Sequence, residues 1–213
     1  MKNHLNKLCM IFCITASVIA SAQKNLPDPE GLHGTHPSDC SRATPESVID
    51  PEVFPDSKFL LNKDSLNGYN WLSFKNGDKL LIINCGCSDY TLVFQFTTSR
   101  YSADTSNYKY WYPKAVELMN EVVRGLGKNE PLRIQKGIDT LTGFIAHCPD
   151  SLTRGHILFY DYDKNPGDDI TSDPDRYAAY MNMFPHLYLN RISKLNDKEY
   201  MVEIYFTIQL TEE

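Results

Sequence analysis

Four cysteines carry the most reactive chemistry in the sequence: Cys40, Cys85, Cys87 and Cys148. The Cys85-Gly86-Cys87 pair would be catalytic if a helix N-terminus or a nearby cation stabilised a thiolate. No Lys, Arg or His is adjacent to it, so structural disulfides are the better interpretation for an exported chain. Three pairings are open, and a bridge within the pair would close a strained ring. We expect the pair to bond separately to Cys40 and Cys148, each bridge stabilising the fold by about 2–4 kcal/mol.

A second group of side chains offers hard oxygen ligands for a metal ion: Asp161, Asp163, Asn165, Asp168 and Asp169. Oxygens at alternating positions followed by a glycine are what Ca²⁺ coordination requires. The match to an EF-hand loop is incomplete, because Pro166 replaces the usual glycine and no glutamate stands at the twelfth position. Two interpretations stay open: a loop fixed by calcium, the one candidate cofactor, or a solvated acidic loop.

Softer metal ligands occur in two further clusters, each of which has a simpler explanation. His33, His36 and Cys40 would suit zinc or copper only if the thiol escaped oxidation. The other cluster is Met181, Met183 and His186, and methionines on a helix usually fill a core.

The segment 147–156 contains the residue types of a catalytic triad: His147, Asp150, Ser151 and His156. A triad is defined by geometry, so these residue types alone indicate little. The sequence contains neither G-x-S-x-G nor H-E-x-x-H. No catalytic residue is therefore assigned.

An aromatic run offers a binding surface instead of reactive groups: Tyr108, Tyr110, Trp111 and Tyr112. Tyrosine and tryptophan are enriched at the centres of protein interfaces. Aromatic side chains also commonly face the core. In an extended chain the tyrosines would share one side and Trp111 the other, and we predict that part of this cluster is a binding surface.

These groups would be positioned mainly by strands, which the alternation of apolar and polar residues predicts. Tyr90, Leu92, Phe94 and Phe96 share one side of a strand, and residues 200–210 show the same period of two. Strands are expected over 58–61, 70–75, 79–85, from 90, 155–162, 187–194 and 199–210. Tight turns are expected at 76–78 and 196–197, where Asn, Gly and Asp gather.

Helical spacing predicts three helices. The first begins at Pro113 and stops at Gly127. The second opens at Pro131, with a hairpin at Asp139-Thr140 as the alternative. The third covers 175–184.

The N-terminus predicts export. Two lysines precede an apolar stretch over 8–20, and Ala20-Ser21-Ala22 is a typical cleavage site. We therefore expect a signal peptide over 1–22, a proline-rich arm over 23–56 and one domain over 57–213. Cleavage would remove two lysines and no acids, which changes the net charge from −6 to −8. An acidic chain without a basic cluster argues against nucleic acid and anionic membrane surfaces as partners.

Hairpin-connected strands with a few helices indicate an α+β fold: an antiparallel β-sheet with two to three helices packed on one face, stapled by disulfides. The expected function is that of a periplasmic or secreted non-enzymatic binding protein with a protein or small-ligand partner. An inhibitor or immunity-type protein that neutralises a basic envelope enzyme fits this description. The alternatives are an envelope enzyme, hydrolytic or thiol-redox, and a calcium-stabilised surface module.

Overall fold

The computed structural model describes residues 44–63, 66–85, 89–127, 130–147, 152, 158–159 and 186–209. These residues form seven strands, two α-helices and a 3-10 turn. Their bounds are β1 (Lys58–Leu61), β2 (Gly68–Ser73), β3 (Lys79–Cys85), β4 (Asp89–Thr98), α2 (Tyr108–Val122), η3 (Val123–Gly125), α3 (Glu130–His147), β5 (Leu158–Phe159), β6 (His186–Lys194) and β7 (Tyr200–Gln209). The α+β prediction is confirmed: one antiparallel sheet is combined with two helices.

The strands lie in the order β1-β2-β3-β4-β7-β6-β5, and every neighbouring pair is antiparallel. The first four strands form a meander. After α2 and α3 the chain returns to the sheet, and the last strand pairs with β4 from Asp89 opposite Gln209 to Thr98 opposite Tyr200. Strands β4 and β7, which are separated in the chain by both helices, therefore pair at the centre of the sheet.

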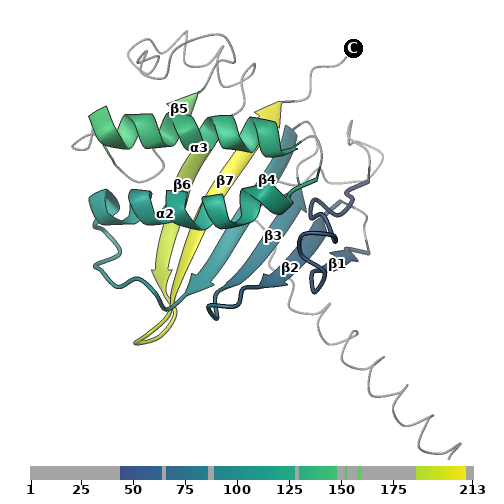
Figure 1. Cartoon of the computed structure of the whole chain (residues 1–213), viewed down its shortest axis with the longest axis horizontal. Coiled ribbons are helices and arrows are strands. Elements are labelled where there is room, and N and C mark those ends of the chain that lie inside the picture. Colours follow the sequence, from purple (N-terminus) through teal and green to yellow (C-terminus); the bar gives the residue numbers. More distant parts are fainter. Residues whose placement is uncertain are drawn as a thin grey trace, which may run out of the picture. The chain divides into compact units, whose positions relative to one another are not determined.

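Helices α2 and α3 lie side by side over one face of the sheet, which we call the helix face (Figure 1). Phe94 of β4 and Ile204 of β7 are directly opposite each other on this face, and both are buried. Trp111 of α2 packs on Tyr200 with 5.2 Å between ring centroids. The predicted alternation in β4 and β7 is confirmed, and its apolar side forms the main core.

Helix α2 begins five residues before the predicted start at Pro113, so that prediction is wrong. Asn107 caps the helix, because its side-chain oxygen accepts a hydrogen bond from the Tyr110 amide at 3.2 Å. Pro113 lies in the second turn, where it removes a single hydrogen bond close to the helix start. The second predicted helix is confirmed as α3, and the alternative hairpin at Asp139-Thr140 is excluded.

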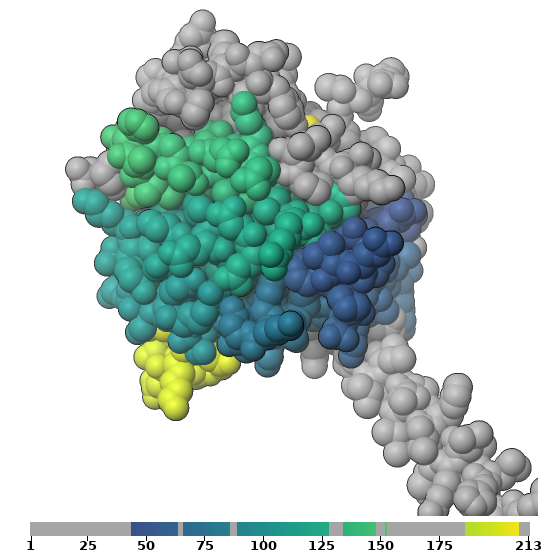
Figure 2. Space-filling view, viewed as in Figure 1, coloured from purple at the N-terminus to yellow at the C-terminus, as the bar shows by residue number. Residues whose placement is uncertain are grey.

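The arm over residues 44–57 covers the part of the helix face near β2 and β3 (Figure 2). Its backbone joins the end of the helical layer: the Asp50 amide donates to the Gly125 carbonyl at 2.9 Å, and the Gly127 amide to the Val48 carbonyl at 2.7 Å. The Phe54 ring occupies the place where a side chain on residue 125 would lie. A larger residue at that position would force the Phe54 ring to move.

Two buried asparagines of the sheet hold this arm. The Asn70 side chain accepts from the Val48 amide at 3.3 Å and donates to the Ser47 hydroxyl at 2.8 Å. The Asn84 amide donates to the Glu46 carbonyl at 3.2 Å. These polar residues interrupt the apolar side of β2 and β3 where an extended backbone needs partners.

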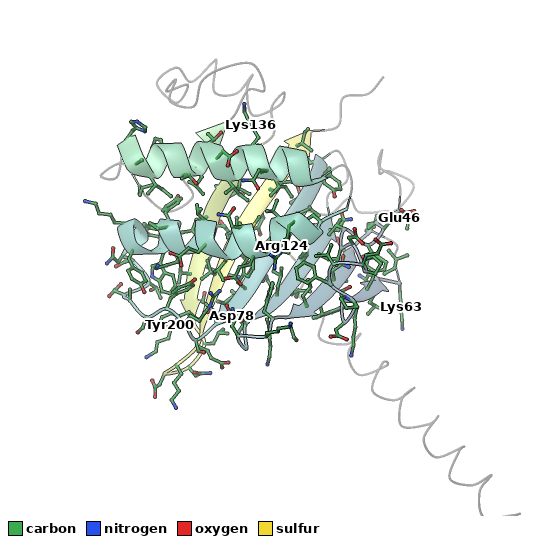
Figure 3. All side chains as sticks on the ribbon, in the orientation of Figure 1. Glu46, Lys63, Asp78, Arg124, Lys136 and Tyr200 are labelled. Carbon is green, nitrogen blue, oxygen red and sulfur yellow. The ribbon has the colours of Figure 1, made fainter. Side chains whose placement is uncertain are left out.

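The β2–β3 turn is tied to α2 by charge. Gly77 has a φ of 91°, which confirms the predicted tight turn. The next residue, Asp78, is buried and lies 2.6 Å from the Arg100 guanidinium, which also contacts Glu121 of α2 at 2.8 Å. Figure 3 shows Asp78 and Tyr200 at the same end of the sheet.

Among the described residues, no helix is long and apolar enough to cross a membrane.

Candidate functional site on the second face of the sheet

The face of the sheet opposite the helices, which we call the second face, carries polar and aromatic side chains that a simple core does not need. In the described part of the chain, both helices lie over the other face (Figure 1). The register of β4, β7 and β6 brings Gln95, Glu203 and Arg191 into one row across the second face.

Glu203 is the centre of this row and is 3% exposed. Its Oε2 atom accepts hydrogen bonds from Gln95 Nε2 at 2.8 Å and Arg191 Nη2 at 3.2 Å. Its Oε1 atom accepts one from Asn190 Nδ2 at 2.7 Å. A carboxylate buried in this way needs several donors, and here three side chains from two neighbouring strands supply them.

A β-bulge explains how one strand supplies two of these donors. The register between β6 and β7 shifts between Leu189 and Arg191, so Asn190 is an extra residue on β6. Strict alternation would place adjacent residues on opposite faces. The bulge lets Asn190 and Arg191 both reach Glu203. Bulges commonly change the direction of a side chain in this way.

A row of stacked rings adjoins the carboxylate. The Tyr205 ring stacks on Tyr188 at 5.4 Å between centroids, and Tyr188 stacks on His186 at 6.0 Å. Burial, followed by the nearby Glu203 charge, raises the pKa of the Tyr205 phenol above its ordinary value. The phenol therefore remains protonated and able to donate a hydrogen bond at neutral pH.

The middle of the second face is apolar. Ile83 and Val93 are fully buried, and Tyr69 and Trp71 stack on the β2 side at 5.9 Å between centroids. Trp71 is half-buried, as are Tyr188 and Tyr205. The apolar centre is inaccessible, and the accessible groups are the half-buried rings on either side of it and the Arg191 guanidinium beside Glu203.

The charge of the second face differs from that of the arm. Register and alternation place three basic residues on this face, Lys58, Lys79 and Arg191, and two acidic ones, Asp89 and Glu203. The arm over 44–57 contains four acidic residues and no Lys or Arg. The acidic character of the chain is therefore not shared by the second face.

Chemically, this arrangement offers hydrogen-bond donors and aromatic rings that are held by their neighbours. Both oxygens of Glu203 already accept hydrogen bonds, so its carboxylate serves to hold its neighbours in place. The rings and the Arg191 guanidinium are the groups that a partner can contact, because they are only partly buried.

Of the four predicted disulfide cysteines, Cys85 lies in the described part of the chain and is fully buried at the end of β3. Cys40, Cys87 and Cys148 lie outside the described residues. The pairing of Cys85 and of the other three cysteines stays a prediction.

The predicted aromatic cluster falls in the first two turns of α2. Trp111 and Tyr112 are fully buried in the core, and Tyr108 and Tyr110 are half-buried against it. The Trp111 indole donates to the Asp104 carbonyl at 3.0 Å. A binding role for the cluster stays a prediction, while the expectation of an extended run is wrong because the segment is helical.

The calcium-loop residues, Asp161, Asp163, Asn165, Asp168 and Asp169, lie outside the described residues, as do the soft-ligand residues His33, His36, Met181 and Met183. His186 is described and lies in β6, buried at 5% exposure. His147 ends α3, where its Nδ1 lies 2.7 Å from the Gly143 carbonyl. Asp150, Ser151 and His156 are not described. No group of three His, Cys, Asp or Glu side chains suited to a metal ion occurs within the described ranges.

Sequence reasoning did not single out Glu203, Arg191 or Tyr205. One signal was present in the sequence. Glu203 is the one charged residue in the run over 200–210, and it lies between Met201 and Tyr205 on the same side of the strand. Its importance depends on which strands flank β7, and the sequence does not give that order.

Comparison with known proteins gives no relative: no family model, curated protein or solved structure matches this chain.

Proposed function

We propose that this chain is an exported binding protein that docks a partner protein on the second face of its sheet. The observation that carries the proposal is the buried Glu203 carboxylate, which fixes an arginine beside a row of tyrosines on the face opposite the helices. The predicted signal peptide supports the export part of the proposal.

The composition of the second face favours a protein as the partner. Tyrosine, tryptophan and arginine are the residues most enriched at the energetic centres of interfaces. Tyr188, Tyr205 and Trp71 are half-buried, and each stacks on a neighbouring ring. Rings that are already held in place lose little conformational entropy on binding.

The charge of the whole chain supports a basic partner. A net charge of −6, or −8 after the predicted cleavage, would attract a basic protein over a distance and speed its encounter. An envelope enzyme such as a cell-wall hydrolase, neutralised by this chain as an inhibitor or immunity-type protein, fits that charge. The long-range field would come from the acidic surface, and the contact would be made by the second face.

The test uses the chain from residue 23 onward as bait for an envelope extract at low salt, followed by a direct affinity measurement with the protein retained. The double variant Tyr188→Ala/Arg191→Ala should weaken binding at least about a hundredfold, because hot-spot residues each contribute about 2 kcal/mol or more.

The matched control is Arg124→Ala, which removes an equally charged side chain from the helix side (Figure 3). It should bind with the affinity of the unaltered chain. Equal loss in both variants, or no retained protein at low salt, would contradict the proposal.

A further inference from the structure

We propose that Arg191 is a receptor for a carboxylate group. The identity of the molecule that supplies the carboxylate rests on the proposed function, but binding at Arg191 can be measured without it.

The first argument is the way in which Arg191 is presented. Its side chain is 49% exposed, and its Nη2 atom lies 3.2 Å from Glu203 Oε2. A guanidinium has five N–H donors in a planar fork that matches a carboxylate with two parallel hydrogen bonds. Because Glu203 holds the group through Nη2 and half of the side chain is exposed, an incoming oxyanion can reach donors on the guanidinium.

The second argument is that Glu203, which holds the guanidinium, is itself held firmly. Glu203 is 3% exposed, and Gln95 and Asn190 donate to it at 2.8 and 2.7 Å. These two amides fix the carboxylate whether or not a ligand is present. Glu203 is therefore a positioning residue, and Arg191 is the group that makes the contact.

The third argument is the set of groups around Arg191. Tyr205 lies one alternation further along β7 from Glu203, and its protonated phenol is a hydrogen-bond donor. Gln95 is half-buried on the other side of Glu203, and an amide NH₂ has two N–H donors. The other acidic residue on this face, Asp89, is paired with Gln209 at the far end of β7, so it does not oppose an anion at Arg191.

The bulge at Asn190 adds specificity for arginine. It places two consecutive β6 side chains on one carboxylate, so the guanidinium is held beside Glu203 by a hydrogen bond from Nη2. A lysine at this position would offer a point charge without the fork. The expected ligand is a carboxylate carried by an aromatic group, because the half-buried Tyr188 and Tyr205 rings lie beside Arg191.

The experiment is a titration of the ¹⁵N-labelled chain, from residue 23 onward, with benzoate, followed by the arginine Nε–H signals. The Arg191 signal should shift and saturate with millimolar affinity, while the Arg124 signal stays in place. Benzamide has the same shape without the charge and should give no saturable shift.

Two variants complete the test. Arg191→Lys retains the charge and should lower benzoate affinity about tenfold, because it removes the two-bond contact. Asn190→Ala removes one of the two amides that hold Glu203 without changing the charge and should also weaken binding, whereas Arg124→Lys should not. Equal shifts with benzamide, equal shifts at Arg124, no saturation, or full affinity in Arg191→Lys would each overturn the proposal. A benzoate site at Arg191 in a chain that retains no envelope protein would contradict only the proposed function.

Discussion

The two faces of the sheet use the same strands for different purposes. On the helix face, Phe94 and Ile204 meet under α2 and α3 and no polar atom is needed between them. On the second face, the residues adjacent to them in the same strands are Gln95 and Glu203, which are joined by a hydrogen bond of 2.8 Å. Because side chains alternate, a change at one position affects one face and leaves the other nearly unchanged. The helix face therefore forms the main core, and the second face carries the polar and aromatic groups to which the proposed function assigns recognition.

The largest expected effect is on the helix face. Phe94→Ala removes a fully buried ring and should lower the free energy of unfolding by about 3–5 kcal/mol. Urea unfolding followed by circular dichroism measures this change. On the same strand but on the second face, Thr97→Ala should change it by less than about 1 kcal/mol. Similar losses from both would remove the distinction between the faces.

A smaller effect is expected from Glu203→Ala. This change leaves three side-chain donors without their shared acceptor, and it should destabilise the chain by about 1–3 kcal/mol. Asn190→Ala removes one donor and should have a smaller effect in the same urea titration. A Glu203→Ala chain as stable as the original would show that the carboxylate has no structural role.

The third prediction concerns alkaline pH. The pKa of Tyr205 in the folded chain is above the value of 10.0 that it has when unfolded, chiefly because of burial. The protonated phenol therefore stabilises the fold below pH 10, and this contribution is lost as the pH rises through the folded pKa. Tyr205→Phe should lose less stability than the original chain between about pH 9 and pH 11.

Tyr101→Phe is the matched variant on the helix side. Burial and a hydrogen bond to Glu117 at 2.9 Å also raise the pKa of Tyr101. Both variants should flatten the alkaline limb of a plot of unfolding midpoint against pH. An unchanged slope in Tyr205→Phe would contradict the pKa direction.

The smallest effect on stability is expected from Arg191→Ala. Its side chain is half-exposed, and Gln95 and Asn190 still donate to the buried Glu203 carboxylate, so the loss should be about 1 kcal/mol. The effect on partner binding should be far larger than the effect on the urea midpoint. A loss of stability similar to that of Glu203→Ala would make Arg191 a structural residue and weaken the contrast between the faces.

The sequence was sufficient for most strands because their chemistry is local. Alternation placed Phe94 and Phe96 on one side of β4, and the Asn76-Gly77-Asp78 turn was visible from residue type alone. The start of α2 was misplaced because Pro113 is a strong signal for a first helical turn. The helix instead begins after Asn107, because the Asn107 side chain accepts a hydrogen bond from the Tyr110 amide and caps the first turn.

The candidate site could not be predicted in the same way. Glu203 is stabilised by residues from β4 and β6, so its environment depends on the strand order and on an extra residue at Asn190. Neither follows from hydrophobic periodicity, since a bulge breaks that pattern at a single residue. The cysteine and calcium predictions depend largely on residues outside the described ranges and remain to be tested.

The pairing of β4 with β7 has a consequence for the timing of assembly. Gln95 and Glu203 are 108 residues apart in the chain, yet they lie on adjacent strands at the middle of the sheet. One edge of β4 therefore stays unpaired during synthesis until β7 is available. The central pairing of the sheet is a long-range contact that forms only after both helices and β7 have been made.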